Sequence, residues 1–131
     1  MCKLYNSILL IVLITGLIGC SQSEILRLEP KEFQTKINAT QNSQVIDVRT
    51  PEEFSNGHLI NAININFQDS SFKTLLAELN INLPVFVYCQ AGTKGGRSDQ
   101  TVLILNTMKF IEVYELSGGI ANWQKTLDIS K

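Results

Sequence analysis

Histidine and cysteine are scarce in this 131-residue chain, and their scarcity excludes two kinds of site. His58 is the only histidine, and the sequence holds no second cluster of metal ligands, so we predict neither a metal site nor an organic cofactor. The three cysteines are Cys2, Cys20 and Cys89. If the first two belong to a leader segment, the folded domain keeps only Cys89, which excludes a disulfide within it.

An excess of positive charge is also lacking, because the formal net charge is −1. A nucleic-acid partner is therefore not predicted. The sequence contains no internal repeat and no low-complexity segment. Residues 25–131 are predicted to form one compact domain, long enough to bury about two-thirds of the surface that its unfolded chain exposes.

An apolar run from Ile8 to Ile18 follows a single charge, Lys3, and ends at Gly19-Cys20. It is too short for a confident membrane span and suits the core of a signal peptide. The small residue before a cysteine resembles the lipobox of bacterial lipoproteins. That resemblance implies a signal peptide at 1–19, a lipidated Cys20 and tether at 20–24, and a domain at 25–131.

The resemblance also implies location in the bacterial cell envelope, on a membrane and facing the periplasm or the exterior. Ser21 after Cys20 favours the outer membrane in a diderm bacterium. An uncleaved anchor and an ordinary secretory signal remain open alternatives, and both also place the domain outside the cytosol.

Predicted strands and helices alternate along the remaining chain. Strands are expected at 25–28, 44–48, 59–65, 85–88 and 110–116. Five helices are expected. The first begins at Pro30, and the second begins at Pro51 with Thr50 and Glu53 as a capping box. The third runs from Ser70-Ser71 through Leu79, the fourth is capped by Ser98 or Asp99 and runs to Met108, and the fifth covers 120–125. This order predicts an α/β fold, a small parallel sheet with helices on both faces, with ligands at the carboxyl ends of strands.

Residues 85–98 are the most informative stretch, because an apolar strand ends at Cys89 and leads through a glycine-rich loop into a helix. Backbone N–H groups and a helix N-terminus favour a thiolate over a thiol, so Cys89 is predicted to be a nucleophile. The glycines let the backbone turn its amides inward, and the loop cations add positive charge. The predicted substrate-binding residues are Gln90, Ala91, Gly92, Thr93, Lys94, Gly95, Gly96, Arg97 and Ser98.

Four segments resemble the rhodanese-like family in order and spacing. They are Asp47-Val48-Arg49-Thr50-Pro51-Glu52-Glu53-Phe54, Gly57-His58-Leu59-Ile60-Asn61-Ala62, Tyr88-Cys89 with Arg97-Ser98, and Gly118-Gly119-Ile120-Ala121-Asn122-Trp123. Asn61 stands where the family has glycine, which is expected to alter a turn. The family's loop is Cys-x-x-Gly-x-Arg-Ser, whereas here residues 90–96 separate the cysteine from Arg97, so this loop is longer.

The resemblance implies a thiosulfate sulfurtransferase without a cofactor. Such an enzyme takes a sulfane sulfur from thiosulfate or a similar anionic donor, holds it as a Cys89 persulfide and passes it to a thiol or cyanide. Asp47, Arg49 and His58 are expected to be structural. The sequence does not identify a protein partner. Two alternatives stay open: a non-catalytic module that binds a partner or senses oxidants, and a cysteine-dependent phosphatase, which the longer loop favours although it exceeds the Cys-x5-Arg spacing of such enzymes.

Overall fold

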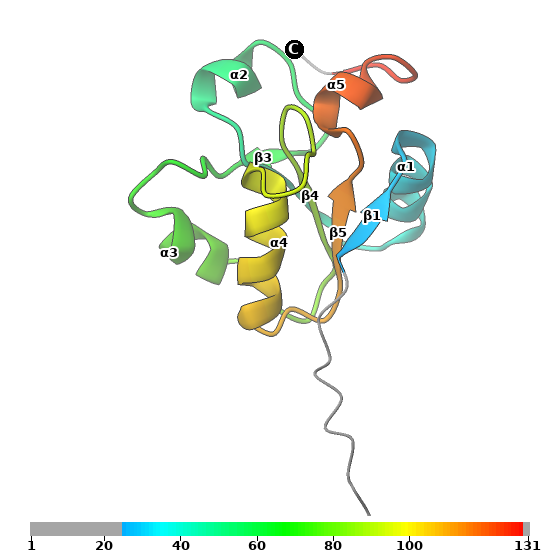
Figure 1. Ribbon diagram of the computed structural model, residues 1–131. Helices are drawn as coiled ribbons and strands as arrows, with labels where there is room; N and C mark the ends of the chain where they lie inside the picture. Colours follow the sequence, from blue (N-terminus) through cyan, green and yellow to red (C-terminus); the bar gives the residue numbers. More distant parts are fainter. Residues whose placement is uncertain (1–24, 130–131) are drawn as a thin grey trace, which may run out of the picture.

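The structure, a computed structural model, describes residues 25–129, in which five strands alternate with five helices (Figure 1). The predicted signal peptide, Cys20 and the tether lie outside the described residues. The elements are β1 (Leu26–Leu28), α1 (Pro30–Ala39), β2 (Gln44–Asp47), α2 (Pro51–Ser55), β3 (Ile63–Asn64), α3 (Phe72–Ala77), β4 (Val85–Tyr88), α4 (Arg97–Thr107), β5 (Val113–Leu116) and α5 (Gly119–Trp123).

The five strands form one sheet in the order β1-β5-β4-β2-β3, and all four neighbouring pairs are parallel. β4 lies at the centre, with Val85 to Tyr88 completely buried. Because every strand runs the same way, all carboxyl ends lie at one edge of the sheet. The predicted α/β class with a parallel sheet is confirmed.

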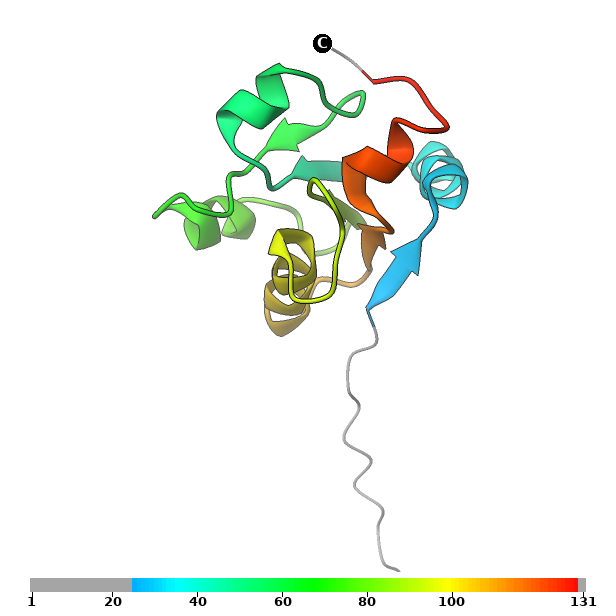
Figure 2. The same ribbon diagram turned by 45° about the horizontal axis from the view of Figure 1, so that its top comes forward.

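Helices cover both faces of the sheet (Figures 1 and 2). On one face, Phe72 and Leu76 of α3 and Leu105 of α4 pack against the strands. On the other, Phe33 of α1 and Trp123 of α5 pack in a second core, with ring centroids 6.3 Å apart. Alternate side chains of each strand therefore enter different cores, which fixes the sheet between two helical layers.

Two predicted strands are longer in the sequence pattern than in the structure. The strand expected at 59–65 is reduced to β3, because Asn61 has a left-handed φ of 61° and turns the chain just before it. Asparagine tolerates this conformation better than most residues, so Asn61 keeps the turn that a glycine would form. The strand expected at 110–116 begins only at Val113, after Lys109 with φ of 70° has turned the chain.

Helix caps were predicted correctly in one case and wrongly in another. Thr50 Oγ1 accepts a hydrogen bond from Glu53 N, and Glu53 Oε2 accepts one from Thr50 N, which confirms the capping box. For α4, however, the N-cap is Gly96 and neither Ser98 nor Asp99. Ser98 is buried inside the first turn, where its hydroxyl contacts other side chains instead of capping the helix.

The helix predicted after Ser70-Ser71 is also shorter than expected. It ends at Ala77 instead of Leu79, and Ser71 occupies the N-cap without a side-chain cap bond, because its hydroxyl donates to Asp69.

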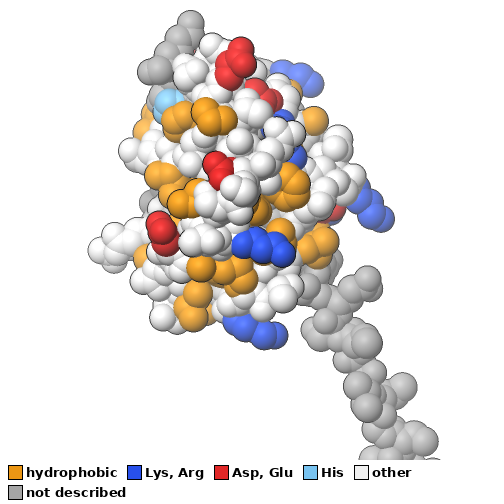
Figure 3. Space-filling view, turned by 90° about the vertical axis from the view of Figure 1, so that its left-hand side faces the viewer, with side chains coloured by type: hydrophobic (Ala, Val, Ile, Leu, Met, Phe, Trp, Pro, Cys, Tyr) orange, Lys and Arg blue, Asp and Glu red, His pale blue; other side chains and the backbone are white. Residues whose placement is uncertain are grey.

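The surface mixes apolar groups with charges of both signs on the face that Figure 3 shows. No helix within residues 25–129 has both the length and the apolar character needed to cross a bilayer.

Candidate active site

Cys89 directly follows β4, the central strand, at the sheet edge where all carboxyl ends meet. The residue is only 3% exposed, and its thiol forms no disulfide. Two groups contact the sulfur: Ser98 Oγ lies 3.1 Å from Sγ, and the backbone N–H of Gly92 donates to Sγ over 3.3 Å. Cys89 therefore combines a central position with two polar neighbours aimed at its sulfur.

Backbone hydrogen bonds connect the first residues of the loop, Cys89 and Gln90, to α5. Ile120 N donates to Cys89 O at 2.9 Å, and Ala121 N donates to Gln90 O at 3.1 Å. Gly119 allows this close approach, since a Cβ there would lie 2.5 Å from Cys89 O, and its φ is +60°. Figure 2 shows the loop beside α5. The Gly-Gly turn thus holds the cysteine backbone in place.

The loop glycines were expected to let the backbone turn its amides inward, and their three amides have different acceptors. Only the Gly92 amide donates to Sγ. The Gly95 amide donates to Asp99 Oδ2 at 2.6 Å, and the Gly96 amide closes a turn onto Thr93 O at 2.8 Å. The additional residues of the loop therefore form a turn of their own beside the helix N-terminus.

The tip of the loop lies in solvent. Its exposed residues are Gln90, Ala91, Thr93, Lys94 and Gly95. The residues predicted as substrate-binding thus divide into this exposed group, three partly buried residues and one buried residue. The partly buried residues are Gly92, Gly96 and Arg97, and the buried one is Ser98. The exposed group therefore lies between Cys89 and solvent along the chain that follows β4.

Arg97, predicted as an anion-binding cation, is held by a carboxylate. Its two terminal nitrogens donate to Glu53 at 2.8 and 3.0 Å. These hydrogen bonds from Arg97 lower the pKa of Glu53 to about 2. Glu53 lies in α2, which follows β2, and Arg97 begins α4, which follows the Cys89 loop. The ion pair therefore connects these two helices. Sequence reasoning assigned Glu53 only to the capping box and missed this second role.

Beneath the sulfur lies a buried polar cluster that the sequence prediction missed. Ser98 Oγ donates to Glu115 Oε1 at 2.6 Å, and Glu115 is completely buried in β5. Arg27 Nε lies 2.8 Å from Glu115 Oε2, an ion pair whose geometry falls short of a hydrogen bond. Arg27 also pairs with Asp99. The signal for this cluster was Glu115 itself, a charged residue in the apolar strand Val113–Leu116.

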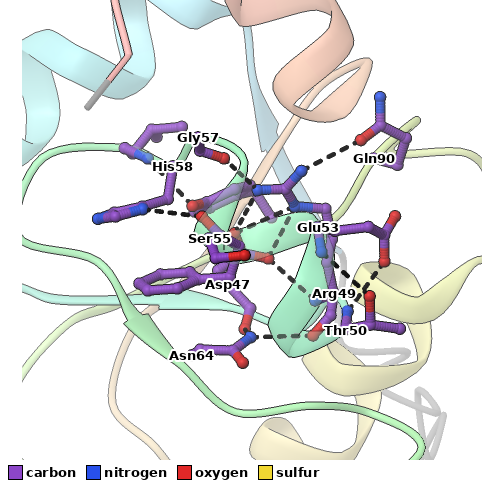
Figure 4. Close-up of polar contacts among 12 residues, drawn as sticks. Asp47, Arg49, Thr50, Glu53, Ser55, Gly57, His58, Asn64 and Gln90 are labelled. Atoms are coloured by element: carbon purple, nitrogen blue, oxygen red, sulfur yellow. Dashed lines mark hydrogen bonds and ion pairs between the residues drawn. The ribbon is translucent and has the colours of Figure 1, made fainter. Parts of the chain in front are cut away.

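A second buried cluster closes the neighbouring strand, β2 (Figure 4). Arg49 binds the Asp47 carboxylate through Nε and Nη2, at distances of 2.7 to 3.1 Å. Arg49 also donates to Gly57 O at 2.7 Å and to the side chain of Gln90 at 3.2 Å. The pair thus fixes the β2–α2 junction and reaches the first loop residue after Cys89.

His58 lies at the far side of this junction. Its ring stacks on Phe54 with centroids 3.8 Å apart, and Nδ1 is 3.0 Å from Phe54 O. Among residues 25–129, no three histidine, cysteine, aspartate or glutamate side chains are arranged to hold a metal ion. The contacts of His58 are those of a residue that packs a turn.

The fold and the arrangement of these motifs can now be compared with known proteins. A family model described as the rhodanese-like domain matches residues 29–126. This chain belongs to the rhodanese-like family. Its Cys89 loop and its Gly118-Gly119 turn both lie within the matched region.

Individual relatives agree with the family. The uncharacterized protein YqhL of Bacillus subtilis is 40% identical over 81 residues, which span 62% of this chain and 60% of YqhL. The thiosulfate sulfurtransferase GlpE of Stutzerimonas stutzeri is 27% identical over 104 residues, 79% of this chain and 89% of GlpE. A rhodanese-like domain protein from Staphylococcus aureus has a crystal structure that superposes with a TM-score of 0.67 at 25% identity, covering 82% of this chain and all of that one. This rhodanese-like domain therefore matches nearly the full length of the last two.

Proposed function

We propose that the protein is a sulfurtransferase that moves a sulfane sulfur from thiosulfate or a similar anionic donor to a thiol or cyanide. One observation carries the proposal: a free cysteine stands at the carboxyl end of the central strand, with a backbone amide and a hydroxyl directed at its sulfur. The similarity to GlpE, named a thiosulfate sulfurtransferase, supports the choice of donor.

The first step is attack by the Cys89 thiolate on the outer sulfur of thiosulfate. A new S–S bond forms, the S–S bond of thiosulfate breaks, and its electron pair leaves with sulfite. The product is a Cys89 persulfide. A cysteine with an ordinary pKa is only about 3% thiolate at neutral pH, so hydrogen-bond donors near the sulfur are needed to increase that fraction. The Gly92 amide occupies such a position.

The second step is attack by the acceptor on the outer sulfur of the persulfide. Cyanide takes that sulfur as thiocyanate, and the electron pair of the broken bond restores the Cys89 thiolate. Between the steps, the outer sulfur extends from the buried Cys89 toward the exposed loop residues. Lys94 lies in this exposed group and supplies a positive charge for the incoming donor.

Arg97 contributes less free charge than its sequence position suggests, because Glu53 neutralises it through two hydrogen bonds. A cysteine-dependent phosphatase needs an arginine whose guanidinium is free to bind two oxygens of the phosphoryl group. The Arg97–Glu53 pair therefore favours transfer of a single sulfur over phosphoryl chemistry.

The test is to incubate the full-length chain with thiosulfate and cyanide, measure thiocyanate, and search for one added sulfur on the Cys89 peptide by mass spectrometry. We expect turnover in the wild type and none in Cys89→Ser. Equal turnover in that variant would contradict the proposal. Phosphate release from an aryl phosphate without thiocyanate would indicate a phosphatase. The absence of both products would leave a binding or redox-sensing module.

We also propose that lipidated Cys20 holds the domain on a membrane of the bacterial cell envelope. The support is the lipobox-like sequence, and two or more acyl chains suffice for stable anchoring. In cells, Cys20→Ser should move the protein out of the membrane fraction. Retention of that variant in membranes would favour an uncleaved apolar anchor instead.

A further inference from the structure

Glu115 is a buried carboxylate that the two steps above do not use. It projects from β5 beneath Cys89 and has no exposed surface. Two groups contact its oxygens: Ser98 Oγ at 2.6 Å and Arg27 Nε at 2.8 Å. A buried charge is costly unless it is fully paired, so the balance of charge around Glu115 determines how readily it takes up a proton.

The cluster around Glu115 contains two carboxylates and one contacting cation, so it has one negative charge in excess. Arg27 is the single cation in contact with two carboxylates, those of Glu115 and Asp99. Asp99 has a further donor in the amide of Gly95, at 2.6 Å, while Glu115 has only the Ser98 hydroxyl. Burial raises the pKa of Glu115 above its usual value, against the opposing effects of Ser98 and Arg27. Glu115 is thus the carboxylate of this cluster that is better placed to accept a proton.

The Ser98 hydroxyl connects this carboxylate to the cysteine. Its oxygen lies 3.1 Å from Cys89 Sγ and 2.6 Å from Glu115 Oε1. A hydroxyl has one proton to donate and lone pairs to accept with. When Ser98 donates to the Glu115 carboxylate, it can accept from a Cys89 thiol. When it donates to a Cys89 thiolate, it can accept from a protonated Glu115. The same positions of the heavy atoms fit both arrangements.

We propose that Cys89 and Glu115 share one proton through Ser98, and that Glu115 accepts the thiol proton when the nucleophile forms. The Cys89 S–H proton moves to Ser98 Oγ while the Ser98 proton moves to Glu115 Oε1. The sulfur keeps its electron pair as a thiolate, and no electron is gained or lost. Cys89 then becomes a nucleophile without release of a proton to solvent. The inference rests on the proposed function, in which Cys89 is the nucleophile, and it adds Glu115 as its proton acceptor.

Proton sharing has a specific signature, because two coupled groups lose their protons in two separate steps. The first proton leaves the pair at lower pH, and the remaining proton is then distributed between sulfur and carboxylate. Over the pH range between the two steps, the thiolate fraction is constant. An isolated cysteine shows one step and no such plateau.

The experiment measures the rate at which uncharged iodoacetamide alkylates Cys89 of the full-length chain, from acid to alkaline pH. Peptide mass spectrometry reads alkylation at Cys89 itself, so that other thiols do not contribute. We expect two steps with a plateau in the wild type and a single step in Glu115→Gln, whose amide cannot take up the proton. A single step in the wild type, or two steps that persist in Glu115→Gln, would overturn the proposal.

Arg27→Met gives a second test, in which the substituted residue is itself partly exposed. Arg27 is partly exposed and reaches Cys89 only through Glu115 and Ser98. Its loss should shift the shared proton toward Glu115 and raise the plateau rate about 2- to 10-fold. Without proton sharing, loss of a nearby cation would lower the rate. An unchanged or lower rate therefore contradicts the proposal.

The matched control for Arg27→Met is Lys36→Met, which removes a cation from α1 on the opposite face of the sheet, where Lys36 lies 5.1 Å from the centroid of the Tyr114 ring. Its alkylation profile should equal that of the wild type.

Ser98 is tested by a pair of variants. Ser98→Thr retains a hydroxyl and should retain the plateau, whereas Ser98→Ala should lose it. A plateau of wild-type height in Ser98→Ala would overturn the role of the hydroxyl.

These readouts are independent of sulfur transfer. A two-step profile without thiocyanate formation would reject the proposed function and keep the proton sharing. Thiocyanate formation with a one-step profile would support the proposed function and reject the proton sharing.

Discussion

The carboxyl ends of β2 and β4 are neighbours in the sheet, yet different interactions close them. At the end of β2, Asp47 and Arg49 form a buried ion pair with several hydrogen bonds, and the chain has little freedom there. At the end of β4, backbone bonds from α5 hold the main chain, while the Cys89 sulfur contacts only a hydroxyl and one amide.

The difference separates an end closed by paired charges from the end at which we propose that sulfur transfer occurs. The β2 end pairs its buried charges internally, because the Asp47 carboxylate binds the Arg49 guanidinium. The β4 end keeps a polarizable sulfur beside the Ser98 hydroxyl and the Gly92 amide, and backbone hydrogen bonds from α5 hold the cysteine main chain. The charged junction at β2 stabilises the position of the neighbouring loop, whereas the Cys89 sulfur has only two polar contacts. This arrangement positions the cysteine without fixing its chemical state.

The largest expected effect comes from breaking the ion pair at β2. Asp47→Asn leaves Arg49 as a buried cation without its carboxylate, and we expect the free energy of unfolding to fall by about 3 to 5 kcal/mol. Glu115→Gln, at the β4 end, should cost less, about 1 to 3 kcal/mol, because a neutral side chain is already tolerated there. Urea unfolding measures both. A larger loss in Glu115→Gln than in Asp47→Asn would remove the distinction between the two ends.

An intermediate effect is expected from the glycine that holds the Cys89 backbone. A Cβ at position 119 would lie 2.5 Å from Cys89 O, so Gly119→Ala must displace the start of the loop. We expect a loss of about 2 to 4 kcal/mol in unfolding free energy and a changed alkylation rate at Cys89.

The control for this variant is Gly95→Ala, at a position with φ of +74° where a Cβ would meet nothing within 4 Å. Gly95→Ala should lower the free energy of unfolding by only about 1 kcal/mol, because a non-glycine residue must then adopt the left-handed backbone conformation. Equal losses in Gly119→Ala and Gly95→Ala would show that the close contact with Cys89 is unimportant.

The smallest effects concern the pH dependence of two carboxylates, one from each region. Glu53, on the helix after β2, has a pKa lowered to about 2 from 4.5 by its Arg97 partner. Its contribution to stability is therefore fully present above about pH 4.5 and is lost as the pH falls toward 2. Glu115 has a pKa raised above 4.5 by burial, so its contribution is present below pH 4.5 and is lost as the pH rises through its folded value.

Stability curves of the wild type, Glu53→Gln and Glu115→Gln across pH measure both contributions. The wild type should gain stability relative to Glu53→Gln as the pH rises from 2 to 4.5. It should lose stability relative to Glu115→Gln above pH 4.5. Differences with the same sign in both comparisons would contradict the assignment of opposite environments.

The features that local sequence predicts are those decided by neighbours in the chain. The capping box needs only Thr50 and Glu53, three residues apart, and it is present as predicted. The position of Cys89 follows from the apolar strand before it and the helix after it. One local expectation was wrong: Asn61 was expected to alter a turn, but it adopts the left-handed conformation that glycine also allows.

The features that local sequence cannot predict depend on which strands become neighbours. Glu115 contacts Ser98 because β5 lies beside β4 and α4 packs against both, and no local pattern states this order. Glu53 finds Arg97 across 44 positions of sequence. For the same reason Ser98 was assigned to a helix cap: its neighbours in the chain suggest a cap, while its neighbours in space are Cys89 and Glu115.

The uniform direction of the strands also orients the molecule with respect to its own first residues. β1 begins at the amino edge of the sheet, and Cys89 lies at the carboxyl edge, so the chain enters the domain on the side opposite its reactive sulfur (Figure 1). Ile25, the first residue that the structure describes, therefore lies on the amino side of the sheet. Whatever is attached ahead of Ile25 therefore joins the domain on the side away from Cys89, so the attachment point and the sulfur do not compete for the same edge of the sheet.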